Sequence, residues 1–260
     1  MTTLTQTTDD TAPDGGAGAA PRSTGSRATR VLGTVILVTA PIAAYLGLVT
    51  SDPDVVQGDA VRLFYVHVPV VSLMYLPVIL CTVASIMWLR KRTDGWDALA
   101  SSSAEVATIF VGLGLVTGAL WGEITWGTYW TWDARLTSTA LLFLLLLGYL
   151  ALRRYPAEPA ARSKVSAVVG ILLVPNAILV HYSVSWWRSL HQDATRGLDT
   201  KMEGNQLTTY AVAQGVFVLI LVWLSIHAFR VAWLSLQAER GDLDVAIAER
   251  MADDDATGGM

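Results

Sequence analysis

The sequence is poor in cysteine: Cys81 is the only one among 260 residues. A single thiol excludes an intrachain disulfide, a zinc site built on paired cysteines and a C-x-x-C redox pair. Cys81 lies within a long apolar run, and free cysteines are among the most buried residues of proteins. We therefore expect Cys81 to be a small, buried, hydrophobic residue.

Charge is also scarce. Charged residues make up 15% of the chain and hydrophobic residues 53%, and the mean hydropathy is +0.45. A water-exposed surface needs more charge than this. The longest basic run is the triplet from Arg90 to Arg92, so nothing indicates a nucleic-acid-binding surface. No nucleotide-binding motif occurs either.

Long apolar runs, in contrast, are abundant. A transmembrane helix needs about 20 predominantly apolar residues. Six runs meet or approach this length, which predicts an all-α integral membrane protein with six transmembrane helices. The predicted spans are 31–50, 66–89, 104–121, 136–152, 165–185 and 208–229. Pro41, Pro77 and Pro175 lie inside these spans and Pro69 lies at an edge, so kinks are expected.

The two ends of the chain differ from this middle part. Residues 1–30 are rich in Thr, Gly, Ala, Pro and Ser, which predicts a disordered tail rather than a signal peptide. Residues 31–230 form the predicted membrane domain. Within 231–260, three apolar residues recur at helical spacing among acidic ones. They predict either a plain amphipathic extension or a helix that docks a cytoplasmic partner; they are Leu243, Ile247 and Met251.

The distribution of basic residues predicts the orientation. Thirteen of the 18 Lys and Arg residues fall on one side of the six predicted spans, and this side is expected to be cytoplasmic. Both termini are then cytoplasmic. Three loops face outward, namely 51–65, 122–135 and 186–207.

The most informative stretch is a dense aromatic cluster on the outward side. Its members fall within twelve positions: Trp121, Trp126, Tyr129, Trp130 and Trp132. An interfacial belt usually places one or two aromatic residues at each helix end, so this cluster is too dense for a belt alone. Gly122 and Gly127 within it indicate close approaches or turns.

Such a cluster suits a large, flat, apolar ligand, because indole faces stack on planar rings. Arg135 offers a planar fork that matches a carboxylate. Haem combines a flat macrocycle with two propionates and fits both features. Asp133 either orients Arg135 or caps the following helix. Further residues extend the aromatic surface or are candidates for the propionates, although the charged ones can equally be solvated: Trp186, Trp187, Arg188, Arg196 and Arg62.

A haem iron also needs axial ligands, and the chain has four histidines. His67 and His191 lie on the predicted outward side among aromatic residues, so they form the better pair of imidazole ligands. His181, near the outward end of the fifth span, is the alternative. His227 lies on the cytoplasmic side and is expected to be structural.

Residues Trp121 to Ser138 resemble the tryptophan-rich "WWD" signature of a family of haem-handling membrane proteins. The segment from Trp132 to Ser138 is similar to the cytochrome c maturation protein C (CcmC) branch of that family. Two further blocks, Arg62 to Pro69 and Trp186 to Gln192, fit the same family. The resemblance covers about residues 31–230. This sequence departs from the family pattern in having Tyr129 in place of the first Trp of the usual Trp-Trp pair, and no proline after Gly122.

The resemblance implies a function and partners. His67 and His191 would be the axial ligands of haem b, bound without a covalent bond, and the haem-binding platform would be Trp121, Trp126, Trp130, Trp132 and Asp133. A protein of this kind is expected in the cytoplasmic (inner) membrane, where it presents haem at the outer, periplasmic face. It would pass haem to the chaperone CcmE and work with CcmA, CcmB and CcmD, without being an enzyme.

Other functions fit the sequence less well. A b-type cytochrome needs histidine pairs deep in the spans, and no predicted span contains two. The related proteins that ligate haem to apocytochrome are usually longer and carry additional spans and histidines. A solute transporter is expected to have ionisable residues in the middle of the membrane, and none is evident.

Overall fold

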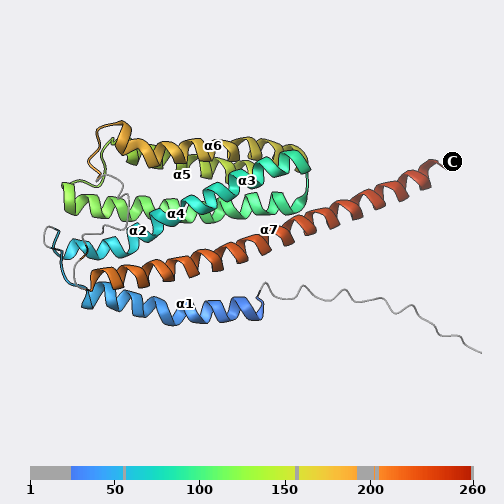
Figure 1. Ribbon diagram of the computed structural model, residues 1–260. Coiled ribbons are helices and arrows are strands. Elements are labelled where there is room, and N and C mark those ends of the chain that lie inside the picture. Colours follow the sequence, from blue (N-terminus) through green and yellow to red (C-terminus); the bar gives the residue numbers. More distant parts are fainter. Residues whose placement is uncertain (1–24, 55–56, 156–157, 192–201, 203–204, 259–260) are drawn as a thin grey trace, which may run out of the picture.

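The computed structural model describes residues 25–54, 57–155, 158–191, 202 and 205–258. Within these residues the chain is helical and contains no β-strand, apart from one isolated bridge between Asp54 and Gly58. The elements, in chain order (Figure 1), are α1 (Arg27–Tyr45), the π-helix η1 (Leu46–Thr50), the 3-10 helix η2 (Asp59–Leu63), α2 (Phe64–Leu73), α3 (Tyr75–Lys91), α4 (Asp94–Trp126), α5 (Ala134–Arg154), α6 (Pro159–Trp186) and α7 (Gln206–Gly258).

The six predicted spans are confirmed in number and order. Six helical segments of the described chain are long and apolar enough to cross a membrane. Each segment contains its predicted span, and all six are longer than predicted. The chain is therefore an all-α membrane protein.

Two of the predicted outward loops are shorter in the structure. Helix α4 continues to Trp126, so the first part of the predicted loop 122–135 is helical. The predicted loop 51–65 already turns into η2 at Asp59. In both cases the helix extends past the apolar run into a polar stretch, where hydropathy alone does not predict a helix. Ser26 caps α1, and the helix starts at Arg27 inside the predicted disordered tail, of which residues 1–24 lie outside the described part.

The second span is divided into two helices. Helices α2 and α3 meet at Met74, the residue that separates them. Pro77 follows in the first turn of α3, where the missing N–H of proline leaves no intrahelical bond unmade. The break thus agrees with the kink expected in this span, whereas α1 and α6 continue through Pro41 and Pro175.

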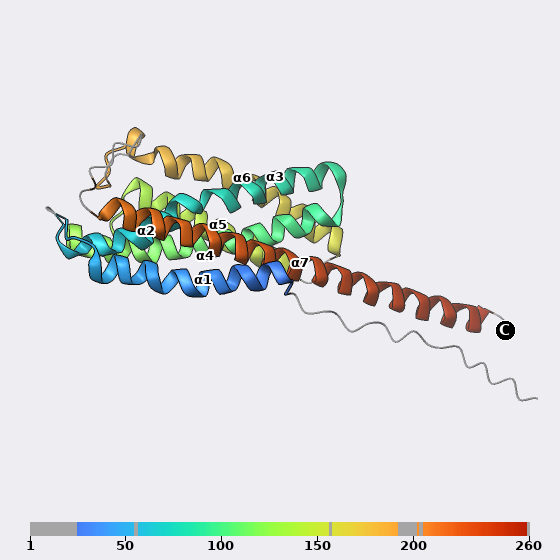
Figure 2. The ribbon, with the colours of Figure 1, turned by 60° about the horizontal axis from the view of Figure 1, so that its bottom comes forward.

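The helices pack as a compact bundle with one peripheral helix. Helix α5 packs against α6, and α3 packs against both α4 and α6. Helix α1 contacts chiefly α7 and lies at the edge of the bundle in both views (Figures 1 and 2). Few residues of α1 are buried, so most of its apolar side chains are left to face lipid. The core between α3, α4, α5 and α6 contains Phe110, Leu142 and Tyr149.

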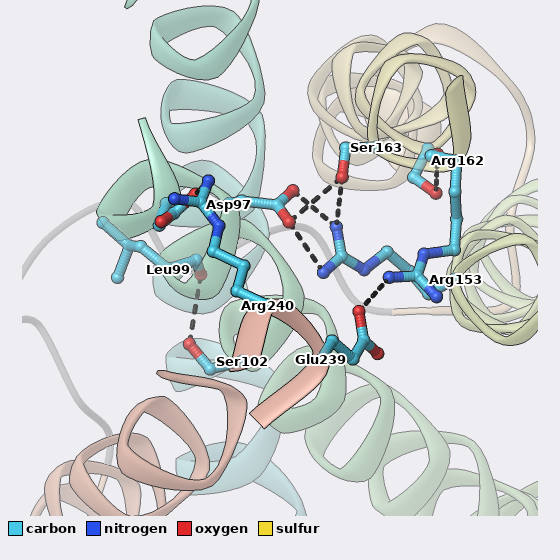
Figure 3. A network of polar contacts seen from close by, with 10 residues as sticks. Asp97, Leu99, Ser102, Arg153, Arg162, Ser163, Glu239 and Arg240 are labelled. Atoms are coloured by element: carbon cyan, nitrogen blue, oxygen red, sulfur yellow. Dashed lines mark hydrogen bonds and ion pairs between the residues drawn. The ribbon is translucent and has the colours of Figure 1, made fainter. Parts of the chain in front are cut away.

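A buried ion pair joins three helices at the end of the bundle where α4 and α6 begin (Figure 3). Arg153 of α5 donates from Nη2 to Oδ2 of Asp97 at 3.0 Å, and Ser163 of α6 donates to the same oxygen at 3.0 Å. Helix α7 is attached to this end through two further pairs, Glu239 with Arg162 and Arg240 with Asp94. None of these pairs was predicted from the sequence.

Helix α7 is continuous from Gln206 to Gly258 and far exceeds the predicted span. The backbone beyond residue 231 is helical, but the side chains of Leu243, Ile247 and Met251 lie outside the described ones, so the amphipathic extension stays a prediction. The start of α1 and the end of α7 lie toward the same end of the bundle (Figure 1). That this end is cytoplasmic stays a prediction from the basic residues.

Candidate functional site

The opposite end of the bundle gathers the segments that the sequence singled out. The starts of α2, α5 and α7 and the ends of α4 and α6 all lie there (Figure 1). Of the predicted site residues, Arg196 lies outside the described residues. The other candidate residues come from these helix ends and the segments next to them.

His67 lies in the first turns of α2 and is held against α4. Its Nδ1 lies 2.9 Å from the hydroxyl oxygen of Thr117. That hydroxyl donates its one proton to the carbonyl oxygen of Leu113 at 2.7 Å. With that proton on the carbonyl, the hydroxyl oxygen accepts from Nδ1–H of His67, and a neutral ring then has its lone pair on Nε2.

A glycine on α4 provides the space for this imidazole. A Cβ atom added at Gly118 would lie 3.0 Å from Cε1 of His67 and 3.6 Å from its Nδ1. Carbon atoms in favourable contact lie about 3.5–4.0 Å apart. Any side chain at this position would thus push the imidazole away from its hydrogen bond with Thr117.

His191 lies beyond the end of α6 and is held by Asp133. Its Nδ1 lies 3.2 Å from Oδ1 of this carboxylate, and its backbone N–H donates to the hydroxyl of Ser189 at 3.0 Å. The carboxylate can only accept, so Nδ1 of His191 carries the proton and Nε2 again holds the lone pair. Among the described residues no hydrogen bond reaches Nε2 of His67 or of His191.

Burial and charge set the protonation of this pair. Burial lowers the pKa of His191 and outweighs the opposing effect of Asp133, while Arg135 lowers the pKa further. Burial acts to raise the pKa of Asp133. Hydrogen bonds from Ser189 and from the backbone N–H groups of Arg135 and Leu190 outweigh burial, and this pKa lies below its ordinary value. At neutral pH the pair is therefore a carboxylate and a neutral imidazole, the form that binds a metal.

His67, in the first turn of α2, and His191, after the end of α6, lie at the same end of the bundle. His67 lies close enough to His191 and to Arg135 to interact with both electrostatically. The ring of His67 meets the edge of Trp121 at a centroid distance of 5.5 Å, and the ring of His191 meets Trp126 at 4.8 Å. Because Trp121 and Trp126 are both in the last turns of α4, this helix end lies next to both imidazoles.

The tryptophans of α4 have structural contacts as well. The indole N–H of Trp121 donates to the side-chain oxygen of Gln57 at 2.9 Å, which attaches the first outward loop to α4. Trp126 lies over Gly122, where an added Cβ would meet its ring at 3.2 Å. Gly127 then ends the helix with a φ of 71°, a left-handed conformation that favours glycine. Of the close approaches or turns expected at the two glycines, Gly122 thus makes a close approach inside α4 and Gly127 makes a turn.

The remaining aromatic candidates are exposed at the same end. Trp132 is 84% exposed and lies edge-on to Trp130 at a centroid distance of 5.7 Å. A second exposed group follows the end of α6, where Trp186 stacks on Tyr182 and meets Trp187 edge-on. The predicted aromatic surface is therefore made of separate edge-on and stacked groups and is not one flat layer. Two other candidates, Tyr129 and Arg188, are also exposed.

Asp133 and Arg135 have different surroundings from those expected for ligand contacts. Asp133 is buried and caps α5, accepting from the N–H groups of Arg135 and Leu136. It also accepts from the N–H of Leu190 at 3.0 Å. Of the two roles considered for Asp133, the structure thus contains the helix cap. The guanidinium of Arg135 donates to the carbonyl oxygen of His181 at 3.3 Å, and Arg62 pairs with Asp59 of its own turn.

The alternative histidines are placed differently. His181 makes edge-on contacts with Tyr75 and Tyr182, and its backbone holds Arg135. His227 lies on α7 against Trp223, 21 positions beyond the start of that helix at Gln206, and is remote from the site in sequence and along the helix.

The donor set fits an iron porphyrin. Two imidazoles whose Nδ1 atoms contact an acceptor, and whose Nε2 atoms receive no hydrogen bond from the described residues, are the axial donors that a six-coordinate haem would take. Among the described residues no group of three or more His, Cys, Asp and Glu side chains could hold a bare metal ion, and a macrocycle would supply the four equatorial ligands. Thr117 and Gly118 were missed by the sequence analysis, although they share a helix face with Trp121 three and four positions on.

Fold and site together define a helical membrane protein of six spans with paired imidazoles and exposed indoles at one end. Comparison with known proteins agrees with this class. The family model described as heme exporter protein C matches residues 19–243. The chain belongs to this family, and it is a multi-pass protein of the inner membrane.

Relatives in several organisms are similar over most of the chain. The heme exporter protein C of Bradyrhizobium diazoefficiens is 36% identical over 199 residues, 76% of this chain and 74% of that protein. The protein of the same name from Haemophilus influenzae is 31% identical over 212 residues, 78% of this chain and 84% of its own. A ccmC-like mitochondrial protein of cytochrome c biosynthesis from Marchantia polymorpha is 33% identical over 154 residues, 59% of this chain and 65% of its own.

Proposed function

We propose that this protein takes part in cytochrome c biogenesis by binding haem b at the outer face of the membrane and delivering it to a CcmE-type chaperone. His67 and His191 hold the iron from opposite faces of the ring, and the exposed indoles contact its edge. CcmA, CcmB and CcmD are the partners proposed for the complex. The protein makes no covalent bond to haem and is not an enzyme.

The observation that carries this proposal is that each of the two imidazoles contacts an oxygen atom through Nδ1. Thr117 and Asp133 each contact Nδ1 of one histidine, and among the described residues no hydrogen bond reaches either Nε2. Two rings in this state at one helix end support binding of a metal between them.

The surroundings support transient binding. Trp132 is largely exposed, and Trp186 and Trp187 are about half exposed, so a porphyrin at this end would keep one edge accessible to another protein. Arg135 interacts electrostatically with both histidines and is placed to attract a propionate. These residues bind and orient the cargo, and release is left to the partners.

The test is the visible spectrum of the full-length protein, purified in detergent from a haem-producing host. We expect a low-spin, six-coordinate spectrum for the wild type and its loss in His67→Ala and in His191→Ala. His227→Ala is the matched control and should keep the wild-type spectrum, and His181→Ala separates the alternative ligand from the proposed pair. A haem-free wild type, or unchanged spectra in both ligand variants, would refute the proposal.

Delivery is tested separately. Holo-protein mixed with the apo form of a CcmE-type chaperone domain should transfer haem to it, and both ligand variants should be deficient in transfer. Retention of haem by the holo-protein in the presence of the complete set of CcmA, CcmB, CcmD, ATP and chaperone would contradict delivery while leaving haem binding intact.

A further inference from the structure

The acceptors behind the two histidines differ in charge. Nδ1 of His191 contacts the carboxylate of Asp133 at 3.2 Å, whereas Nδ1 of His67 contacts the neutral hydroxyl of Thr117 at 2.9 Å. A carboxylate behind a histidine raises the basicity of the ring and strengthens its bond to a metal. The hydroxyl of Thr117, which donates to a backbone carbonyl, carries no charge comparable to that of the carboxylate.

Burial strengthens this difference. The side chain of Asp133 is 4% exposed and that of His191 is 20% exposed. Charges interact more strongly where water is excluded. The contact of Asp133 with the imidazole is therefore worth more here than the same contact on an open surface.

Asp133 is itself rigidly held. Its Oδ1 accepts from the N–H of Arg135 at 2.8 Å, and its Oδ2 accepts from the N–H of Leu190 at 3.0 Å. The first bond belongs to the cap of α5, and the second fixes the residue next to His191. Although His191 lies in a connection after α6, its ring is thereby oriented from the start of a helix.

We propose that the iron is held unequally: Asp133 makes His191 the anchoring ligand, and His67 is the ligand that leaves first when haem is passed on. This inference rests on the proposed function, because it assumes that both imidazoles bind iron. Asp133 acts as a positioning residue through His191 and does not itself contact the haem. Arg135 interacts electrostatically with both rings.

Placement on the backbone alone would predict the opposite order. His67 belongs to a helix and His191 to a connecting segment, so the helix residue would be the anchor if rigidity decided. The carboxylate of Asp133 next to the ring of His191 predicts instead that the histidine of the connecting segment stays bound to the iron. The two expectations predict opposite orders of haem affinity for His67→Ala and His191→Ala, so measuring both variants distinguishes them.

The first experiment measures haem affinity in full-length His67→Ala and His191→Ala by competition with an apoprotein of known affinity. We expect His67→Ala to keep haem in a five-coordinate, high-spin form. The haem affinity of His67→Ala should exceed that of His191→Ala by about tenfold or more, which is the usual effect on metal affinity of a residue that hydrogen-bonds to a metal ligand. Equal affinities, or tighter binding by His191→Ala, would overturn the inference and leave the proposed function standing.

The second experiment is a double-mutant cycle with Asp133→Asn. Asparagine caps helices as well as aspartate, so the start of α5 is preserved while the charge is removed. In the His67→Ala background the substitution should lower haem affinity by about tenfold to a hundredfold. In the His191→Ala background it should have no further effect. Equal losses in both backgrounds would show that Asp133 does not act through His191.

The midpoint potential provides a readout that a purely structural role would not move. An anionic acceptor favours ferric over ferrous iron, so Asp133→Asn with both histidines present should raise the potential. A tenfold change in relative affinity corresponds to about 59 mV for one electron. His227 lies outside the site against Trp223, so His227→Ala is the control and should leave the potential unchanged. An unchanged potential in Asp133→Asn would overturn the inference even if His191→Ala fails to fold, and a haem-free wild type would refute the proposed function and this inference with it.

Discussion

The substitution Gly118→Ala tests the site without weakening the fold. The added Cβ would lie 3.0 Å from Cε1 of His67, at least about 0.5 Å inside a comfortable carbon contact. Relief requires the imidazole to move away from α4, which lengthens its 2.9 Å contact with Thr117. Binding sites tolerate misplacement of only about 0.5 Å, so haem affinity should fall by about tenfold to a hundredfold.

The helix itself should gain from the same change. Alanine is favoured over glycine in a helix interior by about 1 kcal/mol, so Gly118→Ala should unfold at an equal or higher temperature than the wild type. The matched control is Gly148→Ala on α5, where an added Cβ meets nothing within 4 Å. It should gain the same stability and keep full haem affinity.

The assay combines haem content from the pyridine haemochrome with thermal unfolding in detergent. The expected outcome is a variant that folds as well as the Gly148→Ala control but carries far less haem. Wild-type haem content in Gly118→Ala would refute the placement of His67 as a ligand held against α4. Loss of folding in Gly118→Ala would refute the helix geometry on which the reasoning depends.

The remaining predictions concern the opposite end of the bundle and the orientation. Removing one partner of the buried Asp97–Arg153 pair, as in Arg153→Met, should lower the free energy of unfolding by about 3–5 kcal/mol. The double variant with Asp97→Leu should recover much of this loss. If thermal unfolding shows the single variant to be as stable as the wild type, the ion pair does not stabilise the fold. With Cys81 replaced by alanine, an impermeant maleimide added to intact cells should label Trp132→Cys and spare Lys91→Cys, and the reverse pattern would invert the predicted orientation.

The membrane architecture could be predicted because it depends on a local quantity. Each span requires about 20 apolar residues in succession, and six such runs were visible without any knowledge of packing. The limits of α4 could not be predicted as well. Its last turn, up to Trp126, lies beyond the apolar run and is closed by the left-handed conformation of Gly127, whereas hydropathy registers only the part that spans the lipid.

The sequence predicted which residue types make up the candidate site, but not the contacts that hold the two histidines in place. His67, His191 and the aromatic residues stand out by type, so the sequence pointed to them directly. Thr117 was missed because its contact with His67 joins residues 50 positions apart and because threonine inside an apolar run is unremarkable. The contact between Asp133 and His191 likewise exists only because α6 returns to the start of α5.

The buried pair at the other end was missed for the same reason. Asp97 precedes the predicted third span and Arg153 follows the fourth, so both were counted as loop charges. In the structure α4 begins at Asp94, and Asp97 is buried against α5 and α6. A charge near a span end can be solvated or paired, and only the packing of neighbouring helices decides which.

Helix α7 is one continuous helix that joins the two ends of the molecule. At about 1.5 Å per residue its 53 residues extend about 80 Å, far more than the roughly 30 Å of a bilayer core. At one tip Tyr210 packs against Phe64, which in turn meets Trp121. Through these ring contacts α7 is packed against Trp121, whose own ring meets His67, so the long helix and the candidate site belong to one packed unit.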